Sequence, residues 1–240
     1  MQFYIGCSGW YYDEWKSAFY PDGLSKSEWL SYYAQHFSTV EVNNTFYSSP
    51  TPETVQSWAE RISSHFRFTF KAPRFITHQK KFKNTESQIT QFYSTIGTLG
   101  PRLGCILFQI PPTIKKDMDF LEHIFSQLDL RRKNVLEFRH ESWFSRDVYD
   151  VMKEHKVTFC TVSAPDLPKN TVVTGSDFYI RFHGKKEWYD YLYSEQELSS
   201  WSTALSDLPC DQVFCYFNND QHAHAPQNAL SFQHLCEQKK

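Results

Sequence analysis

Charged and polar side chains recur at the ends of short apolar runs along this chain of 240 residues. Several are two residues apart, as Glu137 and Arg139 are, and on a β-strand that spacing places both side chains on one face. Carboxylates beside fixed cations suit proton transfer on a negatively charged substrate. The residues at these ends are Ser8, Glu41, Asn43, Lys71, Gln109, Glu137, Arg139, Arg181, His183 and Asn218.

Four residues are predicted to be catalytic, and they act on a small anionic or sugar-like molecule. Glu41 or Glu137 is the expected general acid or base, and Lys71 helps to hold anionic groups. His183 is the second acid or base, because its ordinary pKa is near neutrality. The predicted substrate-binding residues are Ser8, Trp10, Asn43, Tyr47, Arg74, His78, Gln109, Arg139, Arg181, Asn218, Asn219 and Asp220.

Three other interpretations of these residues stay open. Glu137 could form an ion pair with Arg181 or Arg139 that only ties strands together. Lys71 could form a Schiff base, which we favour less because nothing in the sequence shows that its amine is desolvated. The aromatic and basic loops could also make a binding module without catalysis. No cofactor is predicted and no residue is assigned to a metal; the GxSxG, GxxxxGK[ST], GxGxxG and HExxH motifs do not occur.

The elements that must position these residues alternate between strand and helix. Apolar, β-branched and aromatic runs predict strands at 3–8, 39–43, 66–71, 104–109, 134–139, 157–162, 178–183 and 212–218. Helical periodicity lies at 25–36, 52–63, 86–99, 117–128, 145–155, 195–206 and 225–237. Two prolines and a glycine in residues 163–177 predict an irregular crossover there.

Eight alternations predict a single parallel (β/α)8 barrel of TIM type over residues 1–240, although an open doubly wound sheet has the same local pattern. Every strand, the sixth through Thr161 and Ser163, is expected to contribute polar groups to the C-terminal face. The neighbours expected to face outward, under the helices, are Val40, Val42, Phe68, Phe70, Leu136, Phe138, Ile180, Phe182, Cys215 and Phe217.

The charge and composition of the chain limit the partners and the cellular compartment that can be expected for it. The formal charge of −2 gives no general attraction for polyanions, so a nucleic acid partner is not favoured. The six cysteines show no CxxC or Cys/His cluster and are expected to be free thiols. A cytoplasmic protein without a membrane partner is expected, because the first residues carry no basic segment followed by an apolar one and no run of 18 apolar residues occurs. The oligomeric state is left open.

A family resemblance runs through the same strand ends. The segments that carry it are GCSGWYYDEW (6–15), FYP (19–21), EVNNTFYSSP (41–50), FKAPRFITH (70–78), LGCILFQIPP (103–112), LEFRHESW (136–143), RFHG (181–184), YFNND (216–220) and HAPQNA (224–229). They resemble the YecE-like family, domain of unknown function 72. The resemblance implies a (β/α)8-type barrel and no established reaction. It departs at Ser17 and Ala223, where the family often has glycine.

That family is similar in fold to barrels such as endonuclease IV and xylose isomerase, which is an analogy of fold only. By analogy with endonuclease IV, the alternative function is metal-assisted cleavage of a phosphodiester in nucleic acid. It requires a divalent metal, and the ligands available to it are Glu41, Glu137, His183, Asp220 and His78.

Overall fold

The protein is an eight-stranded parallel barrel, as predicted, in a computed structural model that describes residues 1–238. The strands follow the order β1-β8-β7-β6-β5-β4-β3-β2, and every hydrogen-bonded neighbour is parallel. Their bounds are β1 (Gln2–Cys7), β2 (Thr39–Val42), β3 (Arg67–Lys71), β4 (Leu103–Ile110), β5 (Asn134–Phe138), β6 (Thr158–Ser163), β7 (Asp177–Phe182) and β8 (Gln212–Phe217).

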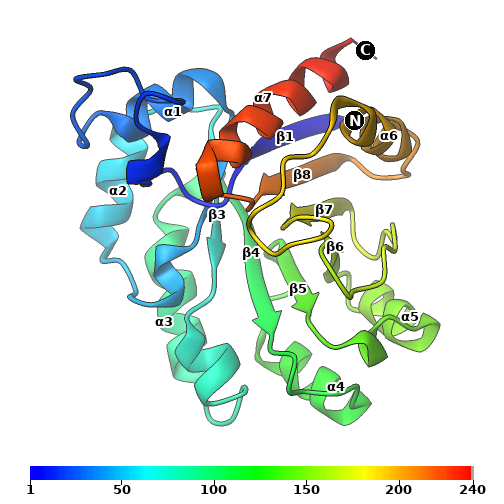
Figure 1. Ribbon diagram of the computed structural model, residues 1–240. Helices are drawn as coiled ribbons and strands as arrows, with labels where there is room; N and C mark the ends of the chain where they lie inside the picture. Colours follow the sequence, from blue (N-terminus) through cyan, green and yellow to red (C-terminus); the bar gives the residue numbers. More distant parts are fainter. Residues whose placement is uncertain (239–240) are drawn as a thin grey trace.

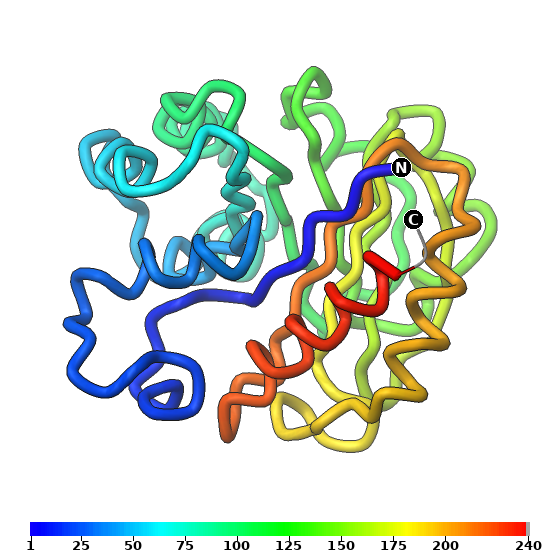
Figure 2. Tube along the Cα trace, turned by 90° about the horizontal axis from the view of Figure 1, so that it is seen from above, coloured from blue at the N-terminus to red at the C-terminus, as the bar shows by residue number. Residues whose placement is uncertain are grey.

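Helices surround this sheet on the outside (Figure 1). Within residues 1–238 the α-helices are α1 (Trp29–His36), α2 (Pro52–Glu60), α3 (Glu86–Gly97), α4 (Met118–Gln127), α5 (Arg146–Glu154), α6 (Glu195–Ser206) and α7 (His224–Glu237). Helix α1 begins later than the predicted residue 25, because Ser25 and Glu28 bond to each other in the preceding turn. Helix α7 packs along β1 and β8 (Figure 2).

Two separate apolar clusters confirm the predicted alternation of side chains. The predicted outward residues, from Val40 to Phe217, all belong to the large cluster beneath the helices. The barrel interior is filled instead by a smaller cluster that includes Tyr4, Leu107, Val162 and Tyr216. The interior is therefore packed with side chains, as in other barrels of this type.

The barrel closes at a seam between β1 and β2, which are neighbours without being paired in the strand order. The Tyr33 hydroxyl bridges the seam: it accepts a hydrogen bond from the Cys7 N–H at 2.7 Å and donates one to the Thr39 carbonyl at 3.0 Å. A Cβ atom on Gly6 would lie 2.2 Å from the same carbonyl oxygen. The strands meet here because residue 6 has no side chain.

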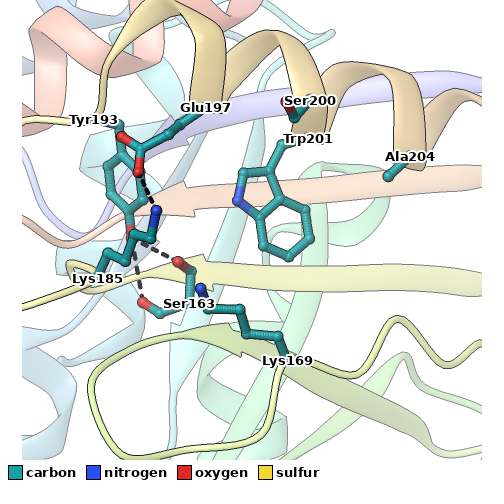
Figure 3. Close-up of a pocket in the computed structure, with 8 residues that line it drawn as sticks. All are labelled: Ser163, Lys169, Lys185, Tyr193, Glu197, Ser200, Trp201 and Ala204. Atoms are coloured by element: carbon teal, nitrogen blue, oxygen red, sulfur yellow. Dashed lines mark hydrogen bonds and ion pairs between the residues drawn. The ribbon is translucent and has the colours of Figure 1, made fainter.

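The crossover from β6 to β7 is irregular through residues 164–176, as predicted. It leaves a cavity of about 280 Å³ beside α6, and Trp201 points into it (Figure 3). The expectation that β6 contributes Thr161 and Ser163 to the C-terminal face is wrong. Thr161 donates to the Asn170 carbonyl of the crossover, and the Ser163 hydroxyl bonds to Tyr193, both outside the barrel. The inward positions of β6 are the alternate, apolar ones, such as Val162.

Ser17 and Ala223, where the resemblance implies glycine, both adopt a backbone conformation typical of glycine. Ser17 has φ of 60° and Ala223 has φ of 58°, the left-handed region that costs a residue with a Cβ atom free energy. Ala223 ends the short loop after β8, next to His222, which has φ of 55°. The loop after β8 is therefore held in strained backbone at consecutive residues.

Candidate active site

Arg181 is the centre of the C-terminal end of the barrel, and it is 1% exposed. Its guanidinium donates to Glu41 Oε1 from Nε and Nη2, at 3.1 and 2.7 Å, and to Glu137 Oε2 from Nη1 at 2.7 Å. Nη2 also donates to Asn218 Oδ1 at 3.1 Å, and Nη1 lies 3.3 Å from His183 Nε2. These contacts engage all five N–H groups of the arginine, so Arg181 has none left for a ligand.

The Glu41 carboxylate, on β2, is equally occupied. The Ser8 hydroxyl donates to Oε1 at 2.7 Å across the seam, and the Tyr179 hydroxyl donates to Oε2. With two further bonds from Arg181, this fully buried carboxylate has hydrogen bonds on both oxygens. Burial of an anion is tolerated where it is paired and hydrogen-bonded, as here.

The Glu137 carboxylate, on β5, is held as an anion. Oε1 accepts from Gln109 Nε2 at 3.0 Å and from Arg139 Nε, and Oε2 accepts from Arg181. Burial opposes ionisation, but Arg139 and Arg181 together hold the pKa of Glu137 well below its usual range. We call Glu41, Glu137 and Arg181 the floor.

His183 is a neutral imidazole on the edge of the floor. Its Nε2 faces two donors, Arg139 Nη2 at 3.0 Å and Arg181 Nη1 at 3.3 Å. Burial and the charges of these arginines hold its pKa well below the ordinary value. Nε2 is therefore the acceptor and Nδ1 carries the proton. Nδ1 is buried and has no hydrogen-bond partner among residues 1–238.

Lys71 ends β3 with its amine against an aromatic face. Nζ lies 4.1 Å from the centroid of the Phe46 ring. The side chain is largely buried, and burial, reinforced by the positive charge of Arg181, lowers the pKa of Lys71 to about 7. Within the described part of the chain, Nζ forms no hydrogen bond or ion pair.

Asp220, after β8, has the opposite shift. Burial, with a smaller contribution from the negative charge of Glu41, raises the pKa of Asp220 to about 7, although the Asn218 amide and Arg181 oppose the shift. Asn218 Nδ2 donates to Oδ2 at 2.9 Å, while Oδ1 is buried without a hydrogen-bond partner in residues 1–238. One oxygen is thus left to exchange a proton.

Arg139 joins this second group of residues. Nε and Nη2 bond to Glu137 and His183, but Nη1 forms no hydrogen bond to any residue from 1 to 238. Its guanidinium carbon lies 4.6 Å from the centroid of the Trp188 ring, which holds the group flat while leaving its edge open. We call Lys71, Arg139 and Asp220 the rim.

An aromatic pocket adjoins the mouth where β1 and β2 end. Trp10, Tyr12 and Tyr47 line this cavity of about 270 Å³ together with Asn43, whose buried Oδ1 has no partner among the described residues. Trp10 is 8% exposed and packs edge-on to Trp58, whereas Tyr47 is 76% exposed. The pocket therefore combines a fixed wall with an open side.

The remaining predicted residues separate into two groups. His78 lies edge-on to Phe46 at 4.9 Å, and burial with the charges of Lys71 and Arg74 lowers the pKa of His78 to about 4. Arg74 is exposed, 6.0 Å from the same ring. Asn219 faces away from the mouth and donates to the Tyr191 carbonyl and to Asn228 Oδ1, so it joins a loop to α7.

Some side chains that shape the site were absent from the predicted set. Tyr179 lies two residues before Arg181, so alternation alone would have placed it on the same face. Phe46 and Trp188 were visible only as loop aromatics, and no sequence signal indicates that each lies over a cation. Tyr12, whose hydroxyl donates to the Ser8 carbonyl at 2.5 Å, likewise carries no distinguishing pattern.

No group of three or more His, Cys, Asp or Glu side chains within residues 1–238 is arranged to hold a metal ion. The ligands expected for metal-assisted cleavage are largely engaged, because Glu41, Glu137 and His183 accept hydrogen bonds from arginine. In the same residues, none of the helices has the length and apolar character needed to cross a bilayer.

Comparisons with known proteins agree on one family. The model for the protein of unknown function DUF72 matches residues 4–240. YecE of Escherichia coli K12 is 33% identical over 144 residues, which are 60% of this chain and half of YecE, so the match spans about half the length of that relative. YunF of Bacillus subtilis 168 is 28% identical over 271 aligned positions, covering 98% of this chain and 94% of YunF.

A solved structure agrees over the same length. The crystal structure of a DUF72 family protein from Thermotoga maritima superposes with a TM-score of 0.91 at 30% identity, covering 99% of this chain and all of that one. Sequence match and fold thus coincide from the first strand to the last helix. The chain therefore belongs to the DUF72 family, whose members share this barrel and have no established activity.

Proposed function

We propose that the protein is an enzyme that transfers protons on a small anionic or sugar-like substrate at the mouth of the barrel. The observation that carries the proposal is the rim, where Lys71 and Asp220 have pKa values of about 7 and where Arg139, whose charge acts on Lys71, has an open edge. Proton transfer is most efficient when the pKa of the acid or base lies near the working pH. Ordinary lysine and aspartate pKa values lie far from that point on opposite sides.

The roles of the charged residues differ from those expected from sequence. Glu41 and Glu137 were expected to move protons, but the hydrogen bonds on their oxygens suit them to fix Arg181 and the barrel strands. We assign proton transfer to Lys71 and Asp220 instead. Deprotonated Lys71 acts as the base, and protonated Asp220 acts as the acid.

Substrate binding is assigned to the open edge of Arg139 and to the aromatic pocket. Arg139 Nη1 can donate to a carboxylate or phosphate while Trp188 holds the guanidinium in place. Trp10 and Tyr47 offer faces for an apolar or sugar ring, and Asn43 Oδ1 can accept from a hydroxyl. A small molecule with one anionic group and one ring or polyol fits this arrangement.

A deuterium-exchange assay tests the proposal whatever product the reaction forms. A panel of sugar phosphates, sugar acids and hydroxy acids is incubated with the protein in deuterium oxide, and carbon-bound hydrogen is followed by NMR. We expect exchange or conversion of at least one compound, with a bell-shaped rate profile centred near pH 7, because Lys71 must be neutral and Asp220 protonated.

Variants assign the roles in that assay. Lys71→Met and Asp220→Asn should each lower the rate at least about 100-fold, whereas Arg139→Met should chiefly weaken binding. Lys80→Met is the control, since Lys80 is an exposed lysine of the segment that follows β3. A panel that neither binds nor reacts, or an active compound whose turnover survives both Lys71→Met and Asp220→Asn, would overturn the proposal.

A further inference from the structure

We propose that Lys71 is a nucleophile that forms a Schiff base with an aldehyde or ketone carrying an anionic group. This inference rests on the proposed function and names the substrate class of the same site. Sequence alone could not favour it, because it requires a desolvated amine. The structure places the amine against Phe46, and within residues 1–238 it forms no ion pair with a carboxylate.

Lys71 differs from the paired lysines of the chain in what its amine contacts. Lys16, Lys116 and Lys185 each place Nζ within 2.9 Å of a carboxylate oxygen, as expected for a structural cation. Lys71 Nζ has no ion pair and no hydrogen bond within residues 1–238. A largely buried amine without a counter-ion is not explained by a structural role.

The surroundings of Lys71 favour its neutral, nucleophilic form. The Phe46 ring, 4.1 Å from the amine, attracts an ammonium, and Glu137 and Glu41 also favour the charged form. Burial and the positive charge of Arg181 outweigh these contributions and lower the pKa of Lys71. The pKa of about 7 that results leaves about half of the Lys71 amines unprotonated at neutral pH, compared with well under one in a hundred for an ordinary lysine. A neutral amine is the form that attacks a carbonyl carbon.

The reaction needs no reagent beyond the substrate and an acid. The lone pair of Nζ forms a C–N bond to the carbonyl carbon while the C=O π electrons move to oxygen, which takes a proton. The amine then loses a proton, and the hydroxyl group leaves as water when an acid of the mouth protonates it. The product is a protonated C=N bond, which withdraws electrons from the adjacent carbon and makes its hydrogen acidic. Nζ can no longer act as the base while it is part of this bond, so Asp220, once it has given its proton to the leaving water, accepts the proton from that carbon.

The anionic group of the substrate is inferred from Arg139. Its Nη1 is open, whereas Arg181 is fully engaged by the floor, so the rim offers one guanidinium to a ligand. A carbonyl compound with a carboxylate or phosphate could reach Lys71 with its carbonyl while Arg139 holds its charge. Simple uncharged ketones lack that second contact.

Trace acetylation tests the nucleophile independently of any substrate. The folded protein is treated with a small amount of acetic anhydride at pH 7, and labelling of each lysine is measured by peptide mass spectrometry. Lys80 is a matched control, because its Nζ also lies over a ring, that of Phe75 at 5.6 Å, but in an exposed position. We expect Lys71 to react at least about tenfold faster, after allowance for its lower accessibility. Labelling no faster than Lys80 would overturn the proposal.

Borohydride trapping tests the covalent step. The protein is incubated with pyruvate, glyoxylate, dihydroxyacetone phosphate or glyceraldehyde 3-phosphate and then reduced with sodium borohydride. We expect a mass increase equal to that of the compound less one oxygen atom, located on Lys71, with at least one of the four. Lys71→Met should abolish the adduct and Lys80→Met should retain it. Absence of an adduct on Lys71 with all four compounds would overturn the proposal.

The two proposals fail in different ways. If a compound binds or exchanges hydrogen in an Arg139-dependent manner but is not trapped, the Schiff base is wrong and proton transfer at the mouth stands. If an adduct forms on Lys71 but no compound exchanges hydrogen or is converted, the Schiff base stands and the proposed proton transfer is wrong. Thermal melting of each variant confirms that a lost signal does not come from unfolding.

Discussion

The floor and the rim of the barrel mouth both combine carboxylates with cations, and they differ in how many of their polar atoms have hydrogen-bond partners. In the floor, the oxygens of Glu41 and Glu137 and the N–H groups of Arg181 have partners. In the rim, the Lys71 amine and one oxygen of Asp220 have none among residues 1–238. Paired charges hold strands together, whereas charges left without partners in partial burial shift their pKa values toward neutrality. Counting hydrogen bonds therefore separates structural from reactive charges.

The largest expected effect comes from removing Arg181, the central cation of the floor, and it tests whether the floor stabilises the fold. Arg181→Met leaves Glu41 and Glu137 buried without the counter-charge that they share, and we expect a loss of about 3–5 kcal/mol in the free energy of unfolding. Urea denaturation measures it. Arg146→Met, at an exposed ion pair with Asp150 on α5, should change little. Equal effects of the two substitutions would contradict a structural floor.

Removing a charge of the rim should raise the free energy of unfolding, whereas removing Arg181 lowers it, and the gain should depend on pH. The folded-state pKa of Asp220, about 7, lies above its unfolded value near 3.8, so folding is penalised as pH rises from about 4 to 7. Asp220→Asn removes the penalty. We expect the variant to match the wild type near pH 4 and to be about 4 kcal/mol more stable above pH 7.

Urea titrations at several pH values measure that difference. Asn at this position keeps the shape of the side chain. A difference in the free energy of unfolding between variant and wild type that is the same at all pH values would show that the pKa of Asp220 is not raised by folding. Lys71→Met should show the complementary pattern, because its lowered pKa penalises the folded state most below pH 7 and less as pH rises toward 10.5.

The floor also depends on the seam that brings Ser8 to Glu41. Tyr33→Phe removes the hydroxyl that joins the Cys7 N–H to the Thr39 carbonyl, and we expect a loss of about 1–2 kcal/mol. Thermal and urea unfolding measure it. Tyr32→Phe, one residue earlier on α1, should have almost no effect, because no hydrogen bond of its hydroxyl is found in the described residues. Comparable losses would mean that the bridge does not hold the seam.

The smallest expected effect concerns backbone strain in the loop after β8, which follows the rim residue Asp220. Ala223 has φ of 58°, so Ala223→Gly should stabilise the protein by about 0.5–1 kcal/mol. Ala204→Gly, at an exposed position within α6, should instead cost about 1 kcal/mol. A loss of stability in Ala223→Gly would show that the loop after β8 is not strained.

The barrel and most of the residues at its mouth could be predicted from the sequence, because alternation along a strand and the order of strands and helices are local properties. Sequence reasoning located Glu137, Arg181 and Lys71 on one face. It misplaced Thr161 and Ser163, because polar side chains at the end of β6 face the irregular crossover, where backbone carbonyls and Tyr193 satisfy them. The sequence of a strand does not show that its outer face packs against an irregular segment instead of a helix, so the polar residues on that face looked like inward ones.

The same reasoning could not assign roles within the mouth. Whether a carboxylate is a proton carrier or a structural anion depends on partners from distant strands, as Glu41 shows with Ser8, Tyr179 and Arg181. The pKa of Lys71 depends on burial beside Phe46, which belongs to the preceding loop. These are tertiary properties, so they appear only once the strands are assembled.

The barrel is a sheet whose two edge strands, β1 and β2, are joined by the Tyr33 hydroxyl. Elsewhere each pair of neighbouring strands is joined by a ladder of backbone hydrogen bonds, but at the seam a side-chain hydroxyl performs that task. Transient opening should begin there, so the Cys7 amide should exchange its hydrogen with solvent sooner than the Ser8 amide, which bonds to the Phe217 carbonyl. Each such opening would separate the Ser8 hydroxyl from Glu41 and remove one hydrogen bond from that carboxylate. Local opening of the barrel at Tyr33 therefore changes the hydrogen bonding of a charged residue in its mouth.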